Sequence, residues 1–275
     1  DNAFGNSETA LAKISVSPAM GNWLDSVNND RPDATKGRVP NENYAREIMQ
    51  LFSVGLVELK SDGTPLLDAN GDPIPTYDQD DIKQFARVFT GWTYANPDGS
   101  AITKKNAVYY GADMGVFPGT ATTGHDTDAK TLLNGTTLSA GQTAQKDLAD
   151  AVHNVFVHPN TGPFVAKLLI QRLVTGNPSD AYVGRIAAKF ANNGSGVRGD
   201  LKAVVRAILL DSEARGPAKA DLAFGSLREP VLMITGLVRA LNGVTDGAAL
   251  GDRTSTLGQR PYYAPTVFNY FQPDE

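Results

Sequence analysis

Apolar side chains recur three and four residues apart over much of the chain, which is the spacing of a buried helix face. The repeats predict helices over residues 44–52, 82–89, 148–156, 164–173, 183–190, 201–208 and 231–241. Residues 10–28 predict only broken helical turns, because Pro18 and Gly21 interrupt the apolar stripe.

Residues that favour helix ends stand beside several of these stripes. Asn41 and Asp200 are N-cap candidates, and Asp78 with Asp81 forms an imperfect capping box. The dipeptide at 177–178 predicts an asparagine cap with proline at the first helical position. His158 precedes a proline that stops the third helix, where a cation would interact favourably with the helix dipole.

Two stretches depart from the helical rhythm. Residues 57–77 carry Asp62-Gly63 and Asn70-Gly71, dipeptides typical of tight turns, and predict a β-hairpin or meander. Residues 93–142 are rich in Gly, Thr, Asn and Asp, and predict an ordered loop excursion. The expected fold is therefore mainly α, with a single helical bundle over residues 1–275 that carries a small β-hairpin and a long loop.

Composition and charge argue against several classes of function. The 275 residues include 25 basic and 30 acidic side chains, for a net charge of −5, and the basic residues are scattered. This argues against binding to nucleic acid and against a polybasic membrane anchor. No apolar run approaches the roughly 18 residues of a membrane span, and the absence of cysteine excludes thiolate chemistry.

One oxygen-rich segment resembles a calcium loop. Asp68, Asn70 and Asp72 place side-chain oxygens at positions one, three and five, Ile74 offers a backbone carbonyl at position seven, and Thr76 completes the candidate set. Position six is proline instead of glycine, and position twelve is glutamine instead of a bidentate acid. The segment therefore predicts either a calcium site or a hairpin turn flanked by solvated aspartates.

The helix at 44–52 has a polar face with candidate catalytic chemistry. Glu47 is the candidate general base, and Arg46 and Asn43 are candidates for orienting it and for binding substrate. The alternative is an ion-paired surface, or a buried network that joins helices, since Glu42 and Arg46 stand four residues apart.

His125 and Asp126 are the other catalytic candidates. They could act as a base with its orienting acid, or as part of a metal site. Adjacent residues rarely point the same way, so the alternative is a loop histidine bonded to backbone. His153 is expected at the surface. Trp92, beside the loop excursion, is a candidate for stacking on a carbohydrate or another flat ligand.

Several long strings resemble the bacterial domain-of-unknown-function 1800 family. They are residues 41–55, 90–93, 124–126, 158–164, 169–175, 194–210, 228–230 and 264–271. The resemblance implies an exported protein, periplasmic or extracellular, whose export signal and upstream portion lie outside this chain, which then is the C-terminal part of the family pattern. It implies no reaction, because the family has no general assigned activity.

Two functional hypotheses follow. In the first, the chain is a calcium-assisted hydrolase of a polar ester, lactone or carbohydrate, in which Glu47 or His125 activates water. In the second, it is a non-catalytic exported module that binds a partner protein or a surface glycan. Motifs for α/β-hydrolases, zinc proteases and phosphate-binding loops do not occur in the sequence.

Overall fold

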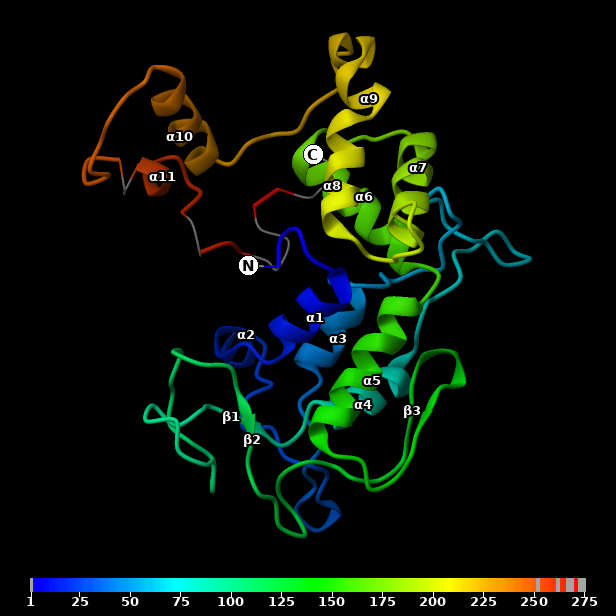
Figure 1. Cartoon of the computed structure of the whole chain (residues 1–275), viewed down its shortest axis with the longest axis vertical. Helices are drawn as coiled ribbons and strands as arrows, with labels where there is room; N and C mark the ends of the chain where they lie inside the picture. The colour runs from blue at the N-terminus through cyan, green and yellow to red at the C-terminus, as the bar shows by residue number, and fades with distance from the viewer. Residues whose placement is uncertain (1, 251–252, 261–262, 266–269, 272–275) are drawn as a thin grey trace.

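The computed structural model describes residues 2–250, 253–260, 263–265 and 270–271, and it is mainly helical, as predicted (Figure 1). Residues 266–269, in the last of the resembling strings, lie outside the described part. The helices are α1 Ser7–Ser15, α2 Pro18–Trp23, α3 Asn43–Gln50, α4 Gln79–Val88, α5 Ala144–Val157, α6 Thr161–Leu173, α7 Asp180–Ala191, α8 Leu201–Leu210, α9 Ser212–Arg215, α10 Pro230–Ala240 and α11 Arg253–Thr256. Within the described residues, no helix combines the length and apolar character that crossing a membrane requires.

Two of the four predicted N-caps are confirmed. Asn41 is not the cap of α3, because Glu42 stands at that position, although Asn41 Oδ1 accepts the N–H of Asn43 at 2.8 Å. Asp78 and Asp81 form the complete reciprocal capping box at the start of α4. The side chain of Asp200 accepts a backbone N–H in the first turn of α8. The start of α7 corrects a prediction, because Ser179 and not Asn177 caps it: the Ser179 hydroxyl accepts the N–H from the first turn.

The apolar helix faces meet in two adjoining cores. The first lies among α3, α4 and α5, with Tyr44 and Phe85 almost fully buried. The second lies among α6, α7 and α8, with Ile170 and Phe190 fully buried. The end of α5 reaches the second core through Phe156, so this helix joins the two. Helices α10 and α11 lie apart from both (Figure 1).

Residues 56–76 form a narrow meander of three extended segments. Antiparallel bridges join Val57 to Pro75, Leu59 to Pro65 and Leu67 to Pro73. Both connections are three-residue loops that end in a left-handed glycine, Gly63 at φ +80° and Gly71 at φ +89°. Each predicted turn dipeptide therefore supplies the left-handed position of its loop.

Asn160 ties the meander to the start of α6. Its buried amide nitrogen donates to the carbonyls of Val54 (3.0 Å) and Val57 (2.7 Å), and its amide oxygen accepts the N–H of Leu59 at 2.9 Å. One side chain thus satisfies backbone groups that the irregular meander edge leaves unpaired.

The predicted loop excursion is ordered by two short antiparallel pairs. Strand β1 (Trp92–Thr93) pairs with β2 (Gly115–Val116), and β3 (Lys130–Thr131) pairs with β4 (Thr137–Leu138). Met114 and Phe117, on either side of β2, are buried and anchor this part of the excursion. The excursion is therefore held by apolar anchors as well as by hydrogen bonds.

His158 differs from the predicted cation at a helix end. It follows the last residue of α5, as expected, but it is buried and its Nδ1 accepts the N–H of Asn160 at 3.2 Å. Burial lowers the pKa of His158, and the nearby Arg198 guanidinium lowers it further. The imidazole is thus a neutral hydrogen-bond acceptor, because the charged form would be desolvated beside a second cation. His153 lies at the surface, as predicted.

Candidate functional site

The candidate substrate-binding residues lie in separate places. Asn43 and Arg46 are half-buried on α3, where Arg46 Nη2 lies 3.2 Å from Glu42 Oε2 and 3.5 Å from Gln79 Oε1. Arg46 therefore helps to join α3 to the start of α4. Trp92 is buried in the first core, and its indole nitrogen has no hydrogen-bond partner among the described residues.

Glu47 faces the interior, whereas Arg46, the preceding residue on α3, is half-buried. The Glu47 side chain is buried, and Oε2 has no hydrogen-bond partner within the described part of the chain. Burial raises the pKa of Glu47, while Arg46 opposes the shift. The Tyr77 hydroxyl is also buried, and it has no hydrogen-bond partner in the part of the chain that the structure describes. Burial raises the pKa of Tyr77, Arg46 opposes the shift, and Glu47 adds to it. Glu47 therefore meets one physical requirement of a general acid or base.

The segment predicted as a calcium loop forms the second turn of the meander. Asp68 Oδ1 accepts the backbone N–H groups of Asn70 (2.8 Å) and Asp72 (2.9 Å), and these bonds lower the pKa of Asp68. The carbonyl of Ile74 accepts an N–H from the adjacent segment, and the Thr76 hydroxyl lies 3.4 Å from the Asn160 amide. In the part of the chain that the structure describes, no group of three or more His, Cys, Asp or Glu is arranged to hold a metal.

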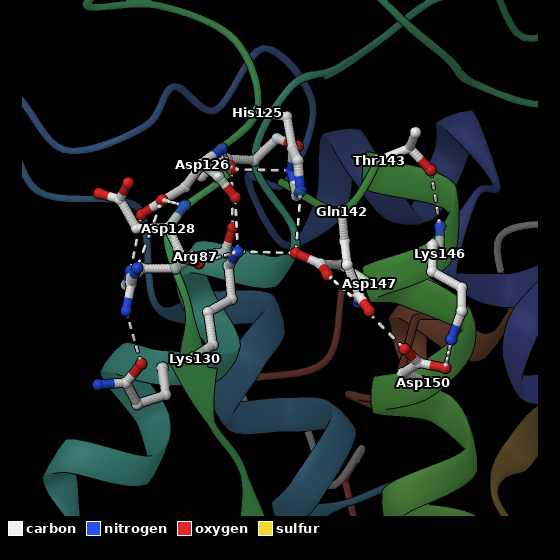
Figure 2. A network of polar contacts seen from close by, with 12 residues as sticks. Arg87, His125, Asp126, Asp128, Lys130, Gln142, Thr143, Lys146, Asp147 and Asp150 are labelled. Atoms are coloured by element: carbon white, nitrogen blue, oxygen red, sulfur yellow. Dashed lines mark hydrogen bonds and ion pairs between the residues drawn. The ribbon is translucent and has the colours of Figure 1, made fainter. Parts of the chain in front are cut away.

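His125 and Asp126 point in different directions (Figure 2). Asp126 Oδ2 accepts a hydrogen bond from Arg87 Nε of α4 at 2.6 Å. His125 Nε2 lies 3.0 Å from Asp147 Oδ2 of α5, and its Nδ1 lies 3.1 Å from the carbonyl oxygen of Thr90. The structure thus brings the pair into one polar network, in which each residue serves a different helix.

Lys130 completes this network from strand β3. Its Nζ donates to Asp147 Oδ2 at 2.7 Å and to two backbone carbonyls of the preceding loop, those of Asp126 and Asp128. Gln142 Nε2 donates to Asp147 Oδ1 at 2.6 Å. The Lys130 and Asp147 side chains are 1% and 0% exposed, so this ion pair is fully shielded from water. We call Arg87, His125, Asp126, Lys130, Gln142 and Asp147 the His125 network.

Hydrogen bonds keep both carboxylates of the His125 network ionised. Burial by itself would raise the pKa of Asp147, but the bonds from His125, Lys130 and Gln142 outweigh it and lower the pKa. In the same way, the pKa of Asp126 is lowered, because the Arg87 guanidinium and a backbone N–H outweigh its burial.

These contacts occupy the Lys130 ammonium and both ring nitrogens of His125. The Lys130 ammonium has three hydrogens and faces three oxygens, and each ring nitrogen of His125 faces an oxygen. No member of the His125 network lines any of three cavities in the described part of the chain, of about 640, 380 and 330 Å³. The arrangement fixes the loop excursion to α4 and α5.

A groove lies between α6 and the meander, with a volume of about 640 Å³. Gly55 allows the close packing of its wall, because a Cβ there would lie 2.7 Å from the Phe164 ring. The lining is mostly apolar, and its polar members come from α3 and α6. The lining residues are Gln50, Leu51, Phe52, Gly55, Leu56, Val57, Leu59, Gly63, Pro65, Phe164, Lys167, Leu168, Leu169, Gln171 and Arg172.

Residues 1–274 match the model of a family described as protein of unknown function, DUF1800. The chain belongs to the DUF1800 family. The match covers the whole length over which the resembling strings are spread. No curated protein and no solved structure matches the chain.

In this DUF1800 chain, reasoning from the sequence missed Asp147 and its partner Lys130. A signal for Asp147 existed, because it lies three residues after Ala144 and four before Ala151, on the buried stripe of α5. The groove had a signal of the same kind. Phe164, Lys167, Leu168, Gln171 and Arg172 recur at helical spacing along one face of α6.

Proposed function

We propose that this chain is a non-catalytic binding module that takes an apolar ligand into the groove between α6 and the meander. The groove itself carries the proposal. Its volume of about 640 Å³ exceeds the roughly 380 and 330 Å³ of two other cavities, and it lies within the range of about 300–1,000 Å³ for small-ligand sites. Its mostly apolar lining, with a few polar side chains on one wall, is also typical of such sites.

The contacts of His125 and Asp126 favour binding over turnover. A catalytic base needs a free lone pair within reach of a substrate. His125 and Asp126 are instead occupied by partners inside the protein, away from the groove. The groove lining contains no histidine, serine or acidic residue that could act as a nucleophile or a base.

Replacing Leu168 by aspartate tests the proposal. The new carboxylate would stand in the apolar lining, where its desolvation opposes ligand entry. We expect a neutral apolar dye such as Nile red, followed by fluorescence titration, to bind the wild-type chain and to bind Leu168→Asp at least about tenfold more weakly. Leu209→Asp, at a partly exposed position on α8 outside the groove, is the control and should leave dye binding unchanged. Equal dye binding by all three proteins would overturn the proposal.

One observation favours a second candidate, a calcium-assisted hydrolase of a polar ester, lactone or carbohydrate. Glu47 combines burial, a raised pKa and a carboxylate oxygen without a partner among the described residues. These are properties of a group that exchanges protons with a substrate or a water molecule. In this proposal, calcium binds the loop that begins at Asp68.

Glu47→Gln separates the two candidates, since it keeps the shape of the side chain and removes its basicity. If the chain is a hydrolase, turnover on a panel of esters, lactones and glycans should fall about 100-fold or more in Glu47→Gln and should depend on calcium. His153→Gln, a surface change, is the control. Calcium should also raise the melting temperature of the wild-type chain by mass action. Absence of turnover on the panel, with no thermal shift in calcium, would count against this candidate.

A further inference from the structure

The groove carries charges of one sign only. Lys167 and Arg172 line it, and its lining contains no acidic residue, although the chain as a whole has a net charge of −5. Both cations are exposed, and neither has an ion-pair partner among the described residues. Their charge is therefore available to a ligand, whereas Arg87 and Lys130 elsewhere in the fold are neutralised by aspartates.

The two walls of the groove differ in character. The meander contributes only apolar side chains, glycine and proline, among them Leu56, Val57 and Leu59. Helix α6 adds both cations and the amide of Gln171 to its apolar residues. An elongated ligand seated here contacts apolar surface along its length and positive charge at the α6 side.

We infer that the ligand is a single acyl chain that ends in a carboxylate, bound with its head group at Lys167 and Arg172. The inference rests on the binding function proposed above and specifies its ligand class. The Arg172 guanidinium can pair with a carboxylate through two parallel hydrogen bonds, and Lys167, five residues earlier on α6, adds positive charge to the same wall. The apolar wall supplies the surface against which the chain packs.

A purely structural role for the two cations predicts a different result. Arg172 lies in the last turn of α6, where a positive charge stabilises the helix, and an exposed lysine aids solubility. Either role changes stability or solubility but does not distinguish a charged ligand from a neutral ligand of the same length. The affinity difference between such ligands therefore isolates the proposed role.

The test compares dodecanoate with dodecanol by isothermal titration calorimetry at about pH 8, below their aggregation concentrations. We expect the wild-type chain to bind dodecanoate about tenfold or more tightly than dodecanol. Lys167→Met and Arg172→Met remove the charge and keep an unbranched, flexible side chain, and each should weaken dodecanoate binding about tenfold while leaving dodecanol binding unchanged. Arg206→Met, on an exposed face of α8 outside the groove, should change neither affinity.

The possible failures can be told apart. If dodecanoate and dodecanol bind equally tightly to the wild-type chain, the groove binds apolar chains but does not distinguish charged from neutral ones. That result overturns only this inference. The same holds if dodecanoate binds the two methionine variants as tightly as it binds the wild type. If neither ligand nor the neutral dye binds the wild-type chain, the proposed binding function fails as well.

Discussion

Asp147→Ala is expected to lower the free energy of unfolding by about 3–5 kcal/mol at neutral pH. Asp147 is fully buried, and its carboxylate is the shared acceptor for Lys130, His125 and Gln142. Its removal leaves the Lys130 ammonium buried without a counter-charge, and water cannot replace the lost partner at a site with 1% exposure. Urea unfolding of the wild type and the variant measures the difference.

Asp150→Ala is the matched control, one turn further along α5. Asp150 pairs with Lys146 at the surface, where an ion pair contributes at most about 1 kcal/mol, and it accepts one further hydrogen bond from Gln142 Nε2 at 3.1 Å. The pH dependence gives a second check. Because the folded-state pKa of Asp147 lies below its ordinary value of about 3.9, the stabilisation is complete above that pH and is lost as the pH falls through the folded-state pKa. Equal losses in the two variants at neutral pH would contradict the role assigned to Asp147.

Gly91→Ala is expected to destabilise the fold by about 2–5 kcal/mol, through strain and overpacking together. Gly91 has a φ of +86°, and an added Cβ would lie 2.6 Å from the backbone nitrogen and 2.9 Å from the Cα of His125. A backbone segment cannot swing aside as a flexible side chain can. The substitution therefore displaces the segment that carries His125 and Asp126 into their network.

Gly71→Ala measures the backbone strain alone, so the difference between the two variants gives the cost of the contact with His125. Gly71 has a nearly identical φ of +89°, but a Cβ there would meet nothing within 4 Å. Its loss should be only about 1–2 kcal/mol, the cost of a left-handed alanine. Both values come from the same urea titrations. If the two variants lose equal stability, contact with His125 contributes nothing measurable to the fold.

The helices and turns could be predicted because their signals are local. The apolar stripe that contains Tyr44 and Ile48 repeats within one helix, and its period is visible without knowledge of its neighbours. Asp78 and the glycines of the meander act within a few residues of themselves. Short helices such as α9 and α11 were not predicted, because a single turn is too short to show a period.

The His125 network and the groove could not be predicted in the same way, since they depend on distant pairings. Arg87 and Asp126 are 39 residues apart, and Lys130 and Asp147 are 17 residues apart, with strand β4 between them. A charged residue on an apolar stripe indicates burial but not its partner. The hydrolase hypothesis from the sequence combines Glu47, His125 and the loop at Asp68 in one mechanism. The fold places these three residues in different surroundings.

Asn160 gives the groove a property that its lining alone would not reveal. The meander forms one wall and α6 forms the other, and the Asn160 amide joins the two just before α6 begins, without itself lining the groove. The spacing of the walls is therefore controlled by a residue that touches no ligand. Substitutions among the lining residues can change the affinity for a ligand while leaving the distance between the walls unchanged. A substitution at Asn160 would instead change the thickness of ligand that the groove accepts.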